Sequence, residues 1–201
     1  TTYLSTLPNF VVMAASDEAE LVRMINTSTE INDRPCAFRY PRGTGSGTLL
    51  PAINEKLQIG KSRIIQEGNK LAILNFGARL NETLKAAENL KKKGGNITIV
   101  DARFAKPKDE NLIWQLATTH EAIVTIEEGS IGGFGSHVVD FLSKKGLMDS
   151  NLKFRSMTLP DVFIDQDLPN NMYKTANLDS SSIEEKVLDV LNSNIVLQKQ
   201  K

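Results

Sequence analysis

The sequence is poor in the residue types on which most catalytic and metal sites depend. Its 201 residues include one cysteine and two histidines, and aromatic side chains make up 6% of the chain. A single cysteine excludes an intrachain disulfide and a thiolate metal cluster. Neither His120 nor His137 belongs to an HExxH or Cys/His metal spacing, and the chain has no Gly-x-Ser-x-Gly motif and no P-loop. A hydrolase triad or a zinc site is therefore not expected.

The sequence also lacks an excess of charge of one sign and a long hydrophobic run. Its 24 Lys and Arg residues balance 24 Asp and Glu residues, which gives a formal net charge of zero. A neutral chain predicts no broad basic surface for nucleic acid or for an anionic membrane, so we expect neither partner. The apolar runs have the length of strands and are far shorter than a membrane span. We therefore expect a soluble, cytoplasmic protein.

The first part of the chain has the pattern of a β-α-β unit. Phe10–Ala15 is apolar at every position, which is typical of a parallel strand covered on both faces. Asp17 and Glu20 have the spacing of a capping box and predict a helix start, and the helix ends before Pro35. Cys36–Tyr40 is then expected as a second short strand.

A single β-α-β unit cannot cover both faces of such an apolar strand. We therefore expect residues 1–56 to be the last part of a larger domain that continues upstream. The segment from Pro41 to about Lys56 is rich in glycine and proline and has no apolar period. We place a domain boundary there, with a second domain over residues 57–201.

Strand and helix patterns alternate through the second domain. Gln58–Gln66 and Lys70–Phe76 are expected to form a hairpin around Gly68 and Asn69. The other expected strands are Ile97–Val100, Ala122–Ile126 and Lys153–Thr158, and the expected helices are Leu80–Lys93, Asp109–Thr118, Ser136–Lys145, Asn170–Thr175 and Ser182–Leu191. This alternation predicts an α/β fold with a mostly parallel sheet flanked by helices.

Arg42 is the main candidate for a binding residue. It follows the strand Cys36–Tyr40 at the carboxyl end, where parallel α/β sheets bind their ligands. The planar guanidinium of arginine is well suited to a phosphate group. A surface loop with a salt bridge is an equally good interpretation of this residue from the sequence alone. Arg39, inside the strand, is expected to be structural.

Two further segments have weaker signals. Ile126–Gly135 is rich in glycine and leads into a helix, but it lacks the GxGxxG order, and its paired glutamates would repel an anion. We favour a tight turn that packs against a neighbouring subunit. Asp101–Asp109 has mixed charges and is expected to maintain the fold. For His120 we favour a surface or helix-capping role, and for His137 a structural one.

Several motifs together resemble the 1-deoxy-D-xylulose-5-phosphate synthase family, in order and in spacing, over essentially Tyr3 to Leu191. These motifs are Ser16–Leu21, Phe38–Gly43, Asp101–Pro107, Ile126–Gly135 and Leu159–Ile164. The family is transketolase-like and uses thiamine diphosphate and Mg²⁺. The resemblance implies that residues 1–56 end a pyrimidine-binding domain and that residues 57–201 form a transketolase-like C-terminal domain.

The resemblance also implies a reaction and a substrate contact. The family condenses pyruvate with glyceraldehyde 3-phosphate, releases carbon dioxide, and works as a homodimer in the bacterial cytoplasm or in a plastid-type organelle. Its product is a precursor of isoprenoids, thiamine and pyridoxal. By resemblance, Arg42 matches the arginine that binds the phosphate of the acceptor aldehyde.

Other family residues have no counterpart in this chain. The motif for magnesium and diphosphate, the glutamate that activates the cofactor and the substrate-handling histidines would lie upstream of Thr1. We therefore expect no catalytic residue and no bound cofactor in the 201 residues alone, and no synthase activity without the upstream portion. Two alternatives stay open: the β subunit of a 2-oxo acid dehydrogenase, and a non-catalytic module for dimerisation or regulation.

Overall fold

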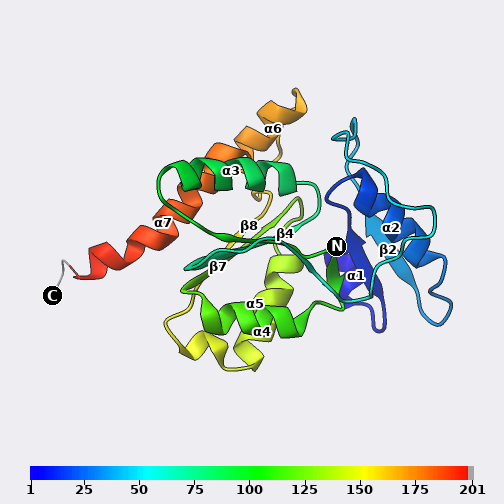
Figure 1. The fold of residues 1–201 in the computed structure, drawn as a ribbon, viewed down its shortest axis with the longest axis horizontal. Coiled ribbons are helices and arrows are strands. Elements are labelled where there is room, and N and C mark those ends of the chain that lie inside the picture. The colour runs from blue at the N-terminus through cyan, green and yellow to red at the C-terminus, as the bar shows by residue number, and fades with distance from the viewer. Residues whose placement is uncertain (199–201) are drawn as a thin grey trace.

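A computed structural model describes the backbone of residues 1–198 and the side chains of residues 1–192. The chain forms two β-sheets with helices packed around them (Figure 1). The strands are β1 (Val11–Ala14), β2 (Cys36–Arg39), β3 (Arg63–Gln66), β4 (Leu71–Phe76), β5 (Thr98–Asp101), β6 (Phe104–Lys106), β7 (Ala122–Glu127) and β8 (Lys153–Met157). The helices are α1 (Thr2–Thr6), α2 (Glu18–Ser28), α3 (Leu80–Lys92), α4 (Glu110–Thr119), α5 (Phe134–Lys144), α6 (Pro169–Thr175) and α7 (Ser180–Gln198), with a 3₁₀ turn at Leu147–Asp149.

The larger sheet has five strands in the order β3-β5-β4-β7-β8. Four of them are parallel, and β3 runs antiparallel to β5 at one edge. Helices α4 and α5 cover one face of this sheet, and α3 and α7 cover the other (Figure 1). All six residues of β4 and all six of β7 are buried, as central strands of a parallel sheet should be. The predicted α/β class is confirmed.

The predicted hairpin between residues 58–66 and 70–76 is wrong. Both strands exist, as β3 and β4, but β3 pairs with β5, and β5 lies between them. At the expected turn, the N–H of Asn69 donates to the carbonyl of Asn96, and the N–H of Gly68 donates to the Thr98 hydroxyl. These bonds direct the chain towards β5. The half-exposed β3 takes the sheet edge, and β4 gains a parallel partner on each side.

The smaller sheet has the order β2-β1-β6 and joins the two predicted domains. Strands β1 and β2 are parallel and belong to the predicted β-α-β unit. Strand β6, which the sequence analysis missed, comes from residues 104–106 and pairs antiparallel with β1. Leu57 and Phe104 also pack into the core of β1. Residues 1–56 therefore share both a sheet and a core with the residues that follow.

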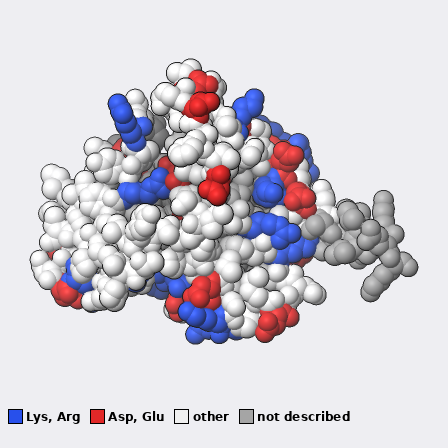
Figure 2. Space-filling model, turned by 180° about the vertical axis from the view of Figure 1, so that it is seen from behind, with Lys and Arg blue, Asp and Glu red and all other residues white. Residues whose placement is uncertain are grey.

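The face of the molecule shown in Figure 2 has no large patch of positively or negatively charged side chains. Positive and negative side chains are interspersed there, and wide areas carry no charged side chain. Within residues 1–198, no helix combines the length and the apolar character that crossing a membrane would require.

Candidate functional site

The carboxyl ends of β1 and β2 carry the residues that the sequence analysis singled out. Strand β2 ends at Arg39, and Arg42 lies three residues further on in an exposed segment. No hydrogen bond or ion pair that the structure records among its described side chains involves Arg42. The guanidinium is therefore open to an anion from outside.

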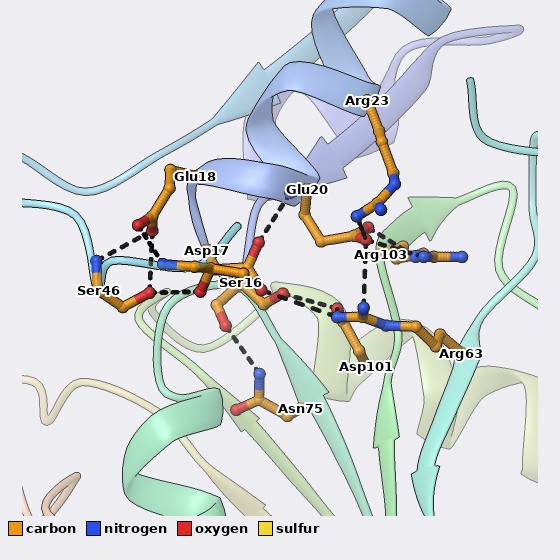
Figure 3. Close-up of polar contacts among 12 residues, drawn as sticks. Ser16, Asp17, Glu18, Glu20, Arg23, Ser46, Arg63, Asn75, Asp101 and Arg103 are labelled. Atoms are coloured by element: carbon orange, nitrogen blue, oxygen red, sulfur yellow. Dashed lines mark hydrogen bonds and ion pairs between the residues drawn. The ribbon is translucent and has the colours of Figure 1, made fainter. Parts of the chain in front are cut away.

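The glycine-rich segment after Arg42 is held at the start of α2 by Glu18. The Glu18 carboxylate accepts hydrogen bonds from the N–H of Ser46 at 3.0 Å, the hydroxyl of Ser46 at 2.9 Å and the N–H of Thr48 at 2.8 Å (Figure 3). The carboxylate also accepts a hydrogen bond from the backbone N–H of Glu18 itself. This bond, together with those from Ser46 and Thr48, lowers the pKa of Glu18 to about 2. The carboxylate is therefore ionised over the whole physiological range.

Glu20 lies beneath this edge and is fully buried among three arginines (Figure 3). Its carboxylate binds Arg103 through two hydrogen bonds of 2.7 and 2.8 Å and Arg23 at 2.9 Å, and Arg63 lies 3.5 Å away. The backbone of Arg103 has a left-handed φ of 58°. The sequence predicted a reciprocal capping box, but only Asp17 caps the helix, through the N–H of Glu20, while the Glu20 side chain binds the arginines.

Asp101 extends this network from the end of β5. One of its carboxylate oxygens accepts the Ser16 hydroxyl at 2.6 Å and the Arg63 guanidinium at 3.1 Å. Its other oxygen has no partner among the described residues. Burial raises the pKa of Asp101 to about 6, and the negative charge of Glu20 acts in the same direction, while Ser16 opposes the shift. From the sequence, this segment is predicted to maintain the fold, and Asp101 and Arg103 do tie β5 and the residues after it to the start of α2.

A second charged cluster lies between the carboxyl ends of β4 and β7. Helix α3 follows β4 on one face of the sheet and α5 follows β7 on the other, so these ends flank a topological switch point. Glu128 fills it: its carboxylate lies 2.8 Å from Arg79 and 3.4 Å from Arg39 at the end of β2. The Arg79 guanidinium stacks on the Tyr173 ring, with its carbon 3.4 Å from the centroid. The cluster links β2 to the larger sheet.

The side chain of Glu127 holds the glycine-rich turn between the end of β7 and the start of α5. This side chain is buried, and one oxygen accepts the N–H of Gly135 at 2.9 Å at the start of α5. The protein thus supplies its own carboxylate to this helix N-terminus. A Cβ on Gly133 would lie 2.3 Å from the other Glu127 oxygen, so the turn closes tightly around the carboxylate. Burial raises the pKa of Glu127.

The two histidines lie away from the Arg42 segment. His120 is the C-cap residue of α4, and its Nε2 lies 2.8 Å from the Thr98 hydroxyl. His137 is the fourth residue of α5, and burial lowers its pKa, with the positive charge of Lys108 adding to the effect. Among the described residues, no group of three or more His, Cys, Asp or Glu side chains could hold a metal ion. The described side chains thus provide no ligand set for Mg²⁺, and no chemical step is assigned to a metal here.

Sequence reasoning located Arg42 but missed Glu18, Glu128 and Arg79. The sequence predicted only that Glu18 lies at a helix start. Its hydrogen-bond partners could not be predicted, because they lie about thirty residues further along the chain. The paired glutamates at 127 and 128 were noted for their charge. The partners of Glu128 come from β2 and from the N-cap of α3, which no local pattern connects.

These features define a mixed α/β protein in which a short parallel unit docks on a larger, mainly parallel sheet. A family model for the C-terminal domain of transketolase matches residues 60–183, well over half of the chain, so the chain belongs to this family. Transketolases are thiamine-diphosphate-dependent transferases.

Two solved structures are similar to the chain. A split-gene transketolase, described as an inactive β4 tetramer, is 24% identical with a TM-score of 0.81, and the match covers 95% of this chain and 61% of that one. Transketolase from Campylobacter jejuni is 16% identical with a TM-score of 0.64, and the match covers 93% of this chain and 27% of that one. At these identities the likeness shows the fold alone, and the chain spans only part of either protein.

Proposed function

We propose that the chain is the C-terminal portion of a 1-deoxy-D-xylulose-5-phosphate synthase. The complete enzyme would condense pyruvate with glyceraldehyde 3-phosphate and release carbon dioxide. Thiamine diphosphate with Mg²⁺, held by the upstream portion, would supply the carbanion chemistry of the reaction. The proposal rests on the transketolase family of residues 60–183 and on the five sequence motifs that resemble the synthase.

The observation that carries the proposal is the position of Arg42. Its guanidinium is exposed beyond the carboxyl ends of two parallel strands, in the Tyr-Pro-Arg-Gly motif, and the described residues provide it with no carboxylate partner. An exposed arginine at such an edge can form charge-assisted hydrogen bonds with a phosphate. In the proposed reaction this contact binds and orients the acceptor aldehyde.

The test is Arg42→Ala in the complete enzyme. Loss of a charge-assisted contact of about 2–4 kcal/mol should raise the KM for glyceraldehyde 3-phosphate about thirtyfold or more. The KM for pyruvate should change little. Arg34→Ala is the matched control, because Arg34 is an exposed arginine before β2, paired with Asp33. An Arg42→Ala enzyme with unchanged KM and kcat would refute the assignment.

A second assay addresses the chain by itself. We expect the purified 201 residues to release no carbon dioxide from pyruvate, since the cofactor-activating residues would lie upstream. Comparing glyceraldehyde 3-phosphate with lipoyl acceptors in the complete protein also separates the synthase from the β subunit of a 2-oxo acid dehydrogenase. Carbon dioxide release by the chain alone would overturn this part of the proposal.

A further inference from the structure

The segment that carries Arg42 has few contacts with the rest of the molecule. All residues from Tyr40 to Leu50 are exposed, and glycines occupy positions 43, 45 and 47. Within the described residues, the hydrogen bonds that tie Pro41–Pro51 to the rest of the chain are those accepted by Glu18. One carboxylate therefore fixes a segment that would otherwise have many accessible conformations.

Glu18 is itself well placed to hold the segment. It is the first residue of α2, directly after the Asp17 cap, so its backbone position is set by the helix. The segment approaches it closely: a Cβ on Gly45 would lie 2.9 Å from the Glu18 carboxyl carbon. Both carboxylate oxygens are engaged by Ser46 and Thr48, and no ion pair is recorded between Glu18 and Arg42.

We propose that Glu18 is a positioning residue for Arg42, because its carboxylate anchors residues 46–48 and thereby limits the conformations available to the arginine. An anchored guanidinium loses less conformational entropy when it binds a phosphate, so the anchor increases affinity without touching the ligand. The anchoring depends only on this chain, whereas its effect on substrate rests on the proposed function of Arg42.

The anchoring is tested on the purified chain with Glu18→Gln. The amide keeps the size of the side chain but removes the charge and places an NH₂ group towards N–H donors. We expect hydrogen exchange of the Ser46 and Thr48 amides to rise about tenfold or more, and tryptic cleavage after Arg42 to accelerate by a similar factor. Glu110→Gln is the matched control, because Glu110 likewise follows an aspartate N-cap, at the start of α4. Unchanged exchange and cleavage in Glu18→Gln would overturn the proposal.

The effect on binding is tested by a double-mutant cycle in the complete enzyme. Glu18→Gln should raise the KM for glyceraldehyde 3-phosphate about three- to tenfold with little change in kcat, and this effect should vanish in an Arg42→Ala background. An effect of Glu18→Gln that persists without Arg42 would refute the positioning role. If Arg42→Ala itself has no effect while the segment loosens as expected, the proposed function fails and the anchoring stands.

Discussion

At the scale of single residues, the charged side chains behind the Arg42 edge connect the two parts of the chain. Glu20 belongs to α2, whereas Arg63 and Arg103 come from β3 and from the connection between β5 and β6. A buried carboxylate is tolerated only where cations and hydrogen bonds compensate for lost water. The cluster can therefore form only when residues 1–56 are docked on the larger sheet.

Glu20→Gln tests that dependence. Removing the charge leaves several guanidinium groups without their shared partner, and such a change in a buried cluster costs about 3–5 kcal/mol of unfolding free energy. Urea denaturation provides the measurement. In the control Glu30→Gln, which removes the exposed pair with Lys56, we expect a change of about 0.5 kcal/mol or less. Equal effects of the two substitutions would contradict the role assigned to Glu20.

Asp101 gives the same cluster a pH dependence. The pKa of Asp101 is raised from its ordinary value of 3.8 to about 6, so the folded protein binds this proton more tightly than the unfolded chain. The associated stability is present below about pH 4 and is lost as the pH rises towards 6, with a magnitude of roughly 3 kcal/mol. Asp101→Asn should lack this fall, so the wild-type unfolding free energy should decline relative to that of the variant as the pH rises from 4 to 7. Parallel profiles from pH 4 to 7 would contradict the shift.

At the scale of elements, local patterns identified the strands and helices but not which strands pair. The apolar run at 71–76 and the helix that ends near Gly94 follow from side-chain periodicity and capping, and both are present. The pairing of β3 with β5, and of β6 with β1, depends on contacts between residues far apart in sequence. The same limit applied to the site: Arg42 stood in a recognisable motif, but the anchor at Glu18 required the folded arrangement.

The turn before α5 provides a prediction at this scale. Gly133→Ala should push the new Cβ against the buried Glu127 carboxylate and lower the unfolding free energy by about 1–3 kcal/mol. Thermal or urea unfolding measures the change. Gly43→Ala is the control, because a Cβ there would meet nothing within 4 Å. A Gly133→Ala protein as stable as the control would mean that the turn can open without cost.

At the scale of the whole molecule, large apolar side chains lie exposed near the carboxyl edge of the larger sheet. Tyr3, Ile131 and Phe163 are 90%, 76% and 105% exposed. Their segments are neighbours, because Gly132 approaches Thr2 and the Leu159 N–H donates to the carbonyl of Gly129. Exposed apolar surface of this kind is typical of an interface. Because the formal net charge is zero, electrostatic repulsion between two copies of the chain is weak. Both features favour the homodimer that the resemblance to the synthase family implies.

Association of the chain with itself can be measured by light scattering over a concentration series. We expect the apparent mass to rise with concentration from the monomer value of 22.2 kDa towards that of a dimer. Phe163→Ser should move the transition to higher concentration, since it removes exposed apolar area. Its unfolding free energy should change by only about 0.5 kcal/mol when measured at concentrations where both proteins are monomeric. Trp114→Ser, at a half-exposed side chain of α4, controls for a general loss of surface hydrophobicity. A strict monomer at high concentration would contradict self-association, and an equal shift in both variants would place the contact elsewhere on the surface.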